Sequence, residues 1–196
     1  MPTTTGVATT FIDFTRASNA TVTDSDGLVK WAPHNLLLAS ESFDAAAWTK
    51  SAGVTTVTAN AVAAPNGTQT ADLITSGVGD GYAYQTVTLV AGVTYTFSVW
   101  LKAQSPSSFA TVLQIYNASD TGTTQTVNVT SDWQMFSLTK TVTQSSSYLI
   151  FVGGSSTLSS ENLYAWGASL YRSDLAMQPN TSAYPLYNPT QPKNLL

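Results

Sequence analysis

Residues 82–102 alternate between apolar and polar side chains almost without a break, except at the short loop from Val90 to Gly92. An alternation with a period of two is the pattern of a β-strand that buries one of its faces. A three-residue loop that ends in glycine predicts a bulged β-hairpin, because Gly92 tolerates the left-handed backbone conformation. We therefore expect two antiparallel strands, Tyr82–Leu89 and Val93–Lys102, that pair across this loop.

This pairing sorts the side chains of the hairpin into two faces. The apolar face is predicted to belong to the core and contains Val87, Leu89, Val93, Tyr95, Phe97, Val99 and Leu101. The opposite face is rich in hydroxyl groups and also carries Tyr82, Tyr84 and Trp100, with Tyr82 directly across from Trp100. An outward tyrosine and tryptophan pair predicts either a ligand-binding surface or a surface that packs against another chain.

The rest of the chain also has the composition of a β protein. Charged residues make up only 9% of the sequence, and threonine and serine, which suit strands better than helices, take their place. Short strand candidates separated by turn-forming clusters follow one another from residue 54 to residue 171, and the only helical candidate is Ser42–Thr49. We predict an all-β fold, an antiparallel sandwich of two sheets.

Three segments differ in character. Residues 1–34 form a lead-in in which residues 20–23 and 28–31 flank the turn Asp24–Gly27, a pattern that predicts a hairpin. Residues 35–172 form the sandwich. Residues 173–196 are too rich in proline for a helix or a central strand, and we expect them to form an extended arm that docks on a neighbouring surface. The docking residues of this arm are predicted to be Tyr184, Leu186, Tyr187, Leu195 and Leu196.

Composition and motifs disfavour several classes of function. Seven scattered Lys and Arg residues and a net charge of −4 predict no nucleic-acid binding, and no stretch is apolar enough for membrane insertion. Cysteine is absent, and the sole histidine, His34, has no motif that supplies a catalytic partner. The sequence Asp24-Ser-Asp-Gly27 lacks the downstream glutamate of a calcium loop and is predicted to be a turn. We expect no catalytic residue, no cofactor and no metal.

Several segments resemble a domain that recurs in structural proteins of tailed bacteriophages and that is similar to carbohydrate-binding modules of the galactose-binding-like jelly-roll type. The segments are residues 35–50, 63–73, 84–102 and 164–170. Residues 13–21 with Asp26-Gly27 also resemble a lead-in found before this domain in phage tail and fibre proteins. The resemblance implies a two-sheet jelly roll and a location on the exterior of a virion. It is compatible with contact to a glycan but does not imply that this copy binds sugar. In a jelly roll a strand can also cross to the other sheet, and Tyr82 and Trp100 would then not be neighbours.

The preferred hypothesis is a non-enzymatic structural component of a phage virion surface: a capsid-decoration, head-fibre or tail-fibre subunit. It would be made in the host cytoplasm without a signal peptide and would bind other virion proteins and sister copies, as a trimer or a dimer, through the arm and the sheet face. The alternative is a glycan-binding adhesion module for a host-surface polysaccharide. A weaker alternative is a part of a depolymerase, for which the chain is short.

The residues predicted to form the glycan site or the interface are the outward aromatic side chains and the amides that could bind sugar hydroxyls. They are Tyr82, Tyr84, Trp100, Tyr116 and Gln114, with Gln85 and Asn117 as further amide candidates.

Overall fold

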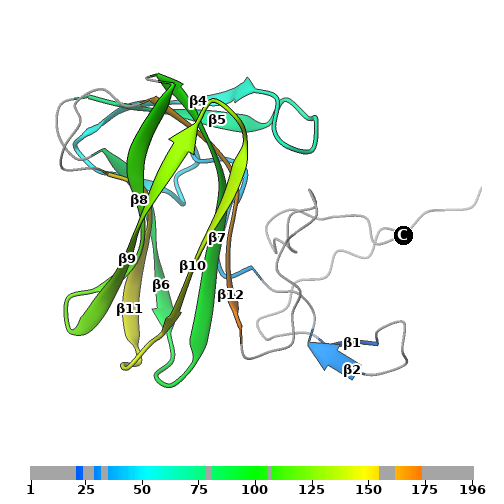
Figure 1. The fold of residues 1–196 in the computed structure, drawn as a ribbon. Coiled ribbons are helices and arrows are strands. Elements are labelled where there is room, and N and C mark those ends of the chain that lie inside the picture. The colour runs from blue at the N-terminus through cyan, green and yellow to red at the C-terminus, as the bar shows by residue number, and fades with distance from the viewer. Residues whose placement is uncertain are drawn as a thin grey trace, which may run out of the picture.

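The computed structural model describes residues 21–23, 29–31, 35–77, 81–105, 107–154 and 162–173. Two antiparallel sheets of five strands each face one another and form a sandwich (Figure 1). The described residues form no helix. The prediction of an all-β, two-sheet antiparallel sandwich is therefore confirmed.

The first sheet has the strand order β10-β7-β12-β5-β4 and the second sheet the order β3-β6-β11-β8-β9. The strands of the first sheet are β4 (Val54–Val62), β5 (Ala71–Ser76), β7 (Thr94–Ser105), β10 (Gln134–Thr141) and β12 (Asn162–Arg172). Those of the second sheet are β3 (Thr49–Lys50), β6 (Tyr82–Leu89), β8 (Ser108–Asn117), β9 (Asp120–Thr130) and β11 (Ser146–Gly153).

A separate two-stranded sheet precedes the sandwich. Its strands β1 (Thr21–Thr23) and β2 (Val29–Trp31) pair antiparallel, as the sequence of the lead-in predicted. The turn Asp24–Gly27, His34 and the docking residues of the C-terminal arm lie outside the described residues, so their predicted roles stay predictions.

The hairpin predicted for residues 82–102 is wrong, because β6 and β7 belong to different sheets. Strand β6 pairs with β3 and β11, whereas β7 pairs with β10 and β12. The loop between them crosses from one sheet to the other at one end of the sandwich, where Gly92 adopts a positive φ of 78°. The amide of Gly92 donates a hydrogen bond to the carbonyl of Val142 at 2.8 Å, which ties the crossing loop to the end of β10.

The predicted apolar face is nevertheless the core, because both strands point it into the space between the sheets. Leu89, Tyr95, Phe97, Val99 and Leu101 are buried, and Val87 and Val93 pack against them from partly buried positions. A sandwich buries the same face of a strand whether its neighbour in sequence pairs with it or lies opposite it. Alternation therefore identified the core without identifying the partner strand.

The predicted short helix does not form: residues 43–48 make successive turns and bends, and Thr49 already begins β3. Amides of Ala45 and Trp48 donate to carbonyls three residues earlier, and the rings of Phe43 and Trp48 stack with centroids 4.4 Å apart, both buried. Asp72 of β5 holds this segment in place. One of its carboxylate oxygens accepts the amides of Phe43 at 2.6 Å and Asp44 at 3.2 Å, and burial raises its pKa although these hydrogen bonds lower it.

The buried amide of Asn35 fixes the start of the domain to β12. Its Oδ1 accepts the backbone amides of Leu37 at 3.0 Å and Leu170 at 2.9 Å, and its Nδ2 donates to the carbonyl of Ala168 at 2.9 Å and to Ser40 Oγ at 3.1 Å. The ladder between β12 and β7 is irregular between Trp166 and Ser169. Asn35 therefore satisfies backbone groups beside this irregularity.

A buried polar cluster joins the start of β9 to β10 and β11. Asp120 accepts hydrogen bonds from the Tyr148 hydroxyl at 2.6 Å and the Thr143 hydroxyl at 2.7 Å, and Lys140 Nζ lies 3.4 Å from the same carboxylate. The hydrogen bonds from Tyr148 and Thr143 hold the pKa of Asp120 well below its usual range. Burial, together with the bond to Asp120, raises the pKa of Tyr148 to about 12.

Candidate functional site

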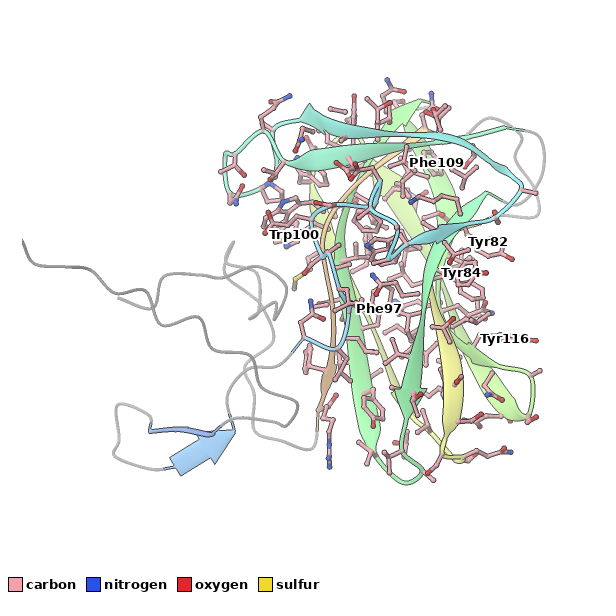
Figure 2. The ribbon with its side chains drawn as sticks, turned by 180° about the vertical axis from the view of Figure 1, so that it is seen from behind. Tyr82, Tyr84, Phe97, Trp100, Phe109 and Tyr116 are labelled. Carbon is pink, nitrogen blue, oxygen red and sulfur yellow. The ribbon has the colours of Figure 1, made fainter. Side chains whose placement is uncertain are left out.

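The outward face of the second sheet carries four neighbouring aromatic side chains, which we call the aromatic platform: Tyr82 and Tyr84 on β6, Phe151 on β11 and Tyr116 on β8. The register places Phe151 opposite Tyr84 on one side and opposite Gln114 on the other. The intervening residues of these strands, such as Ala83 and Ile150, are fully buried. Figure 2 shows Tyr82, Tyr84 and Tyr116 along one side of the sandwich.

Phe151 lies at the centre of the platform and contacts all three tyrosines. Its ring stacks on that of Tyr82, with centroids 4.9 Å apart and an interplanar angle of 16°. The centroids of Tyr84 and Tyr116 lie 6.1 Å and 6.0 Å from that of Phe151. These separations are typical of favourable aromatic pairs, so the four rings support one another and form one continuous surface.

The exposed end of the platform depends on a glycine. Tyr116 is 37% exposed, and its ring lies over β9 at Gly122, where a β-carbon would approach Tyr116 Cδ2 to 3.2 Å. The side-chain amide of Gln114, which lies opposite Phe151 in the register, donates to the hydroxyl of Thr124. No described residue of this face donates to the side-chain carbonyl oxygen of Gln114, so a ligand hydroxyl can donate to it.

The platform is surrounded by neutral groups. On the outward faces of the described parts of β6, β8 and β11, threonine, serine, leucine, valine and alanine accompany the aromatic residues and Gln114, and no carboxylate or ammonium group occurs. Lys50 on the edge strand β3 donates to the carbonyls of Asp44 and Ala45, both at 2.9 Å. Burial lowers its pKa, although Asp44 and Asp72 oppose this.

The structure brings together four of the five predicted site residues, namely Tyr82, Tyr84, Gln114 and Tyr116. It does not bring Trp100 to them. Trp100 lies on β7 in the first sheet and faces outward on the other side of the molecule, as Figure 2 shows. The predicted opposition of Tyr82 and Trp100 is therefore wrong, because β6 and β7 do not pair; the residue opposite Tyr82 is Gly153.

Sequence reasoning missed Phe151, and it placed Gln85 on the wrong face. Residues 148–152 form a continuous apolar run, in which period-two alternation does not separate the outward residue from its buried neighbours. Gln85 points inward and is buried. Its side-chain Nε2 donates to the backbone carbonyl of Leu38 at 2.7 Å, and its Oε1 accepts the backbone amide of Leu38 at 3.1 Å. Asn117 bonds the carbonyl of Ser147 and the amide of Ser119 in the turn after β8.

The described part of the chain contains no group of three or more His, Cys, Asp or Glu residues that could hold a metal ion. No helix within the same residues is long and apolar enough to span a membrane.

The fold and the platform define a jelly-roll domain of the type found in carbohydrate-binding modules. The profile of the family CBM_4_9, described as a carbohydrate binding domain, matches residues 36–158, which is more than half of the sequence. The chain therefore belongs to this family. No curated protein sequence matches the chain significantly.

Solved structures share the fold. The CBM22-1 xylan-binding domain of Paenibacillus barcinonensis Xyn10C superposes with a TM-score of 0.52 at 18% identity, over 72% of this chain and 96% of that one. TmCBM61 in complex with β-1,4-galactotriose gives 0.51 at 16% identity, over 71% and 99%. The enzymatically active domain of bacteriophage CBA120 tailspike protein 4 gives 0.51 at 15% identity, over 70% of this chain but only 21% of that one.

Proposed function

We propose that this protein binds glycans on the outward face of its second sheet, with the aromatic platform as the contact surface. The observation that carries the proposal is the grouping of Tyr82, Tyr84, Tyr116 and Phe151 around one centre on the exposed side of the sheet. Membership in a family of carbohydrate binding domains supports it.

The chemistry of the platform suits sugar rings. The C–H faces of a pyranose are apolar and stack on aromatic rings, whereas its rim hydroxyls need donors and acceptors. Gln114, Thr86 and the tyrosine hydroxyls lie around the platform and supply such groups. Because the described outward side chains of β6, β8 and β11 carry no charged group, we expect a neutral glycan to bind better than an acidic one of similar length.

A glycan array with purified wild-type protein tests the proposal, followed by titration calorimetry with the best ligand. We expect Phe151→Ala to weaken binding at least about tenfold, since a loss of about 1.4 kcal/mol already gives that factor and Phe151 contacts every other ring of the platform. Tyr84→Ala should weaken binding as well.

Thr139→Ala is the matched control, because Thr139 is exposed on the outward face of the first sheet. It should leave binding unchanged. Circular dichroism of each variant separates loss of ligand contact from loss of fold. The proposal fails if the wild type binds no glycan, or if folded Phe151→Ala and Tyr84→Ala bind as tightly as the control.

A place on a virion surface is a second proposal that rests on the resemblance of the sequence to phage structural proteins. The shared fold of the tailspike domain is compatible with it but carries no information on location. Mass spectrometry of purified particles and imaging with an antibody against this chain test it. Absence of the chain from the particles would contradict the virion role and would leave the proposed glycan binding untouched.

A further inference from the structure

The outward face of the first sheet carries a second cluster of large apolar side chains, which we call the tryptophan face: Val62, Trp100, Trp133 and Met135. Val62, Trp100 and Trp133 pack from partly buried positions against the buried Trp166, Ala64 and Ala71. Met135 of β10 lies opposite Trp100 of β7. Figure 2 shows Trp100 on the side of the sandwich away from the tyrosines of the platform.

One polar atom of this face is not satisfied. The indole nitrogens of Trp166 and Trp133 donate to Thr70 Oγ1 and to the carbonyl of Ala63, both at 3.0 Å. The indole nitrogen of Trp100 is enclosed and has no acceptor within the described part of the chain. A buried donor without an acceptor costs free energy, so the packing around Trp100 is less favourable than that around Trp133 and Trp166.

The described chain ends on this same face. Ser173, the last described residue, donates its amide to the carbonyl of Thr94 at 2.8 Å, and its hydroxyl lies 2.5 Å from that of Thr96. Thr96 and Trp100 are on the same outward face of β7, separated by four residues of strand. At about 3.4 Å per residue the distance between them is roughly 14 Å.

Residues 174–196 have the composition to fill such a face. They include Pro179, Pro185, Pro189 and Pro192, with Tyr184, Leu186 and Tyr187 between them. Proline-rich chains favour the polyproline II conformation, which leaves their carbonyl oxygens without internal partners and binds to surfaces lined by aromatic side chains. At about 3.1 Å per residue in that conformation, the segment is long enough to turn back and reach Trp100 from Ser173.

We propose that residues 174–196 dock on the tryptophan face of their own chain. Attachment at Ser173 makes the event intramolecular and gives the segment an effective concentration on the order of millimolar at this face, which a sister copy does not match at low protein concentration. The docked segment covers Trp133 and Met135. Residues 174–196 would then cover the tryptophan face and leave the aromatic platform on the opposite side exposed.

Disulfide trapping tests this docking in the full-length chain, because the sequence contains no cysteine. Ser137, exposed on β10 beside Ser98, provides one position and Ala183 provides the other. The variant Ser137→Cys/Ala183→Cys should form an intramolecular disulfide about tenfold faster than the control Thr86→Cys/Ala183→Cys. Thr86 is also exposed but lies on the platform side and farther from Ser173, so the ratio of the two rates must be compared with the ratio for an undocked segment, which the serine substitutions below provide.

A second set of substitutions tests the apolar nature of the contact. Adding Tyr184→Ser, Leu186→Ser and Tyr187→Ser to each cysteine pair should reduce the ratio of the two rates severalfold, to the value that the distance from Ser173 alone sets. Non-reducing electrophoresis at low protein concentration separates intramolecular disulfides from dimers. Equal rates for the two cysteine pairs, a ratio that the serine substitutions leave unchanged, or disulfides that form only between chains would each overturn the proposal.

Discussion

The substitution Asn35→Ala should be among the most destabilising in the domain. The asparagine side chain is buried and makes four hydrogen bonds, three of them to backbone groups of residues 37, 168 and 170. Alanine leaves the amides of Leu37 and Leu170 without an acceptor, and each buried unsatisfied donor costs about 1–3 kcal/mol. We expect the free energy of unfolding to fall by about 3 kcal/mol, with the local backbone relaxing to offset part of the full cost.

Urea unfolding followed by tryptophan fluorescence and far-ultraviolet circular dichroism measures this loss. With a slope of about 1–3 kcal/mol per molar urea, the midpoint should move down by roughly 1–3 M. Asn128→Ala is the matched control, because Asn128 is exposed on β9 and substitutions at such positions usually change stability by less than about 0.5 kcal/mol. If the midpoints of the two variants agree, Asn35 does not fix the start of the domain to β12 as described.

Four further substitutions have defined outcomes. Gly92→Ala should lower the free energy of unfolding by about 1–2 kcal/mol in the same urea assay. The cost comes from the backbone alone, because φ at Gly92 is 78° and an added β-carbon would meet no atom within 4 Å. An unchanged midpoint would contradict the backbone conformation described for the crossing loop. Gly122→Ala should move the ring of Tyr116 and so weaken glycan binding, measured by calorimetry, with little change in the urea midpoint. Unchanged affinity would show that this end of the platform does not contact the glycan. Asp120 has a depressed pKa when folded, so the stability it contributes is present above its unfolded pKa of about 4 and is lost as the pH falls below that value. In a plot of the urea midpoint against pH, Asp120→Asn should therefore reduce the fall of the midpoint at acid pH. An unchanged fall would show that other groups cause the loss of stability in acid. Tyr148, with its pKa raised to about 12, should titrate later than an ordinary phenol near 10 when followed by absorbance at high pH, and the Tyr148→Phe variant should lack this late step.

The sequence predicted which side chains are buried better than it predicted which strands pair. Alternation placed Phe97, Val99 and Leu101 in the core correctly, because the inward face of a strand is the same whichever strand lies beside it. Pairing depends on whether the chain turns back within one sheet or crosses to the other. The loop from Val90 to Gly92 permits both, and contacts remote in sequence, such as that of Gly92 with Val142, decide between them.

The candidate site was predicted in part for the same reason. Tyr82, Tyr84, Gln114 and Tyr116 fall on the outward parity of their strands and meet on one sheet, whereas Trp100 falls on the outward parity of the other. The alternation along a strand predicts whether a side chain points into the core or away from it. It does not predict on which of the two outer faces of the sandwich an outward side chain lies. Phe151 was missed because its strand is apolar on both faces, and only the register with β6 and β8 reveals that it links the tyrosines.

The aromatic platform lies on β6, β11 and β8, the three interior strands of the second sheet, each of which has a hydrogen-bonded neighbour on both sides. Such strands are the stiffest part of a sheet, so the rings are held in place before any ligand arrives. Most of the conformational entropy lost on binding is then lost by the sugar chain, and the protein loses little. Such a site should bind glycans that are already extended and straight more tightly than flexible ones. Affinity should rise with each added sugar unit until the ligand covers the rings from Tyr82 to Tyr116, and should then level off.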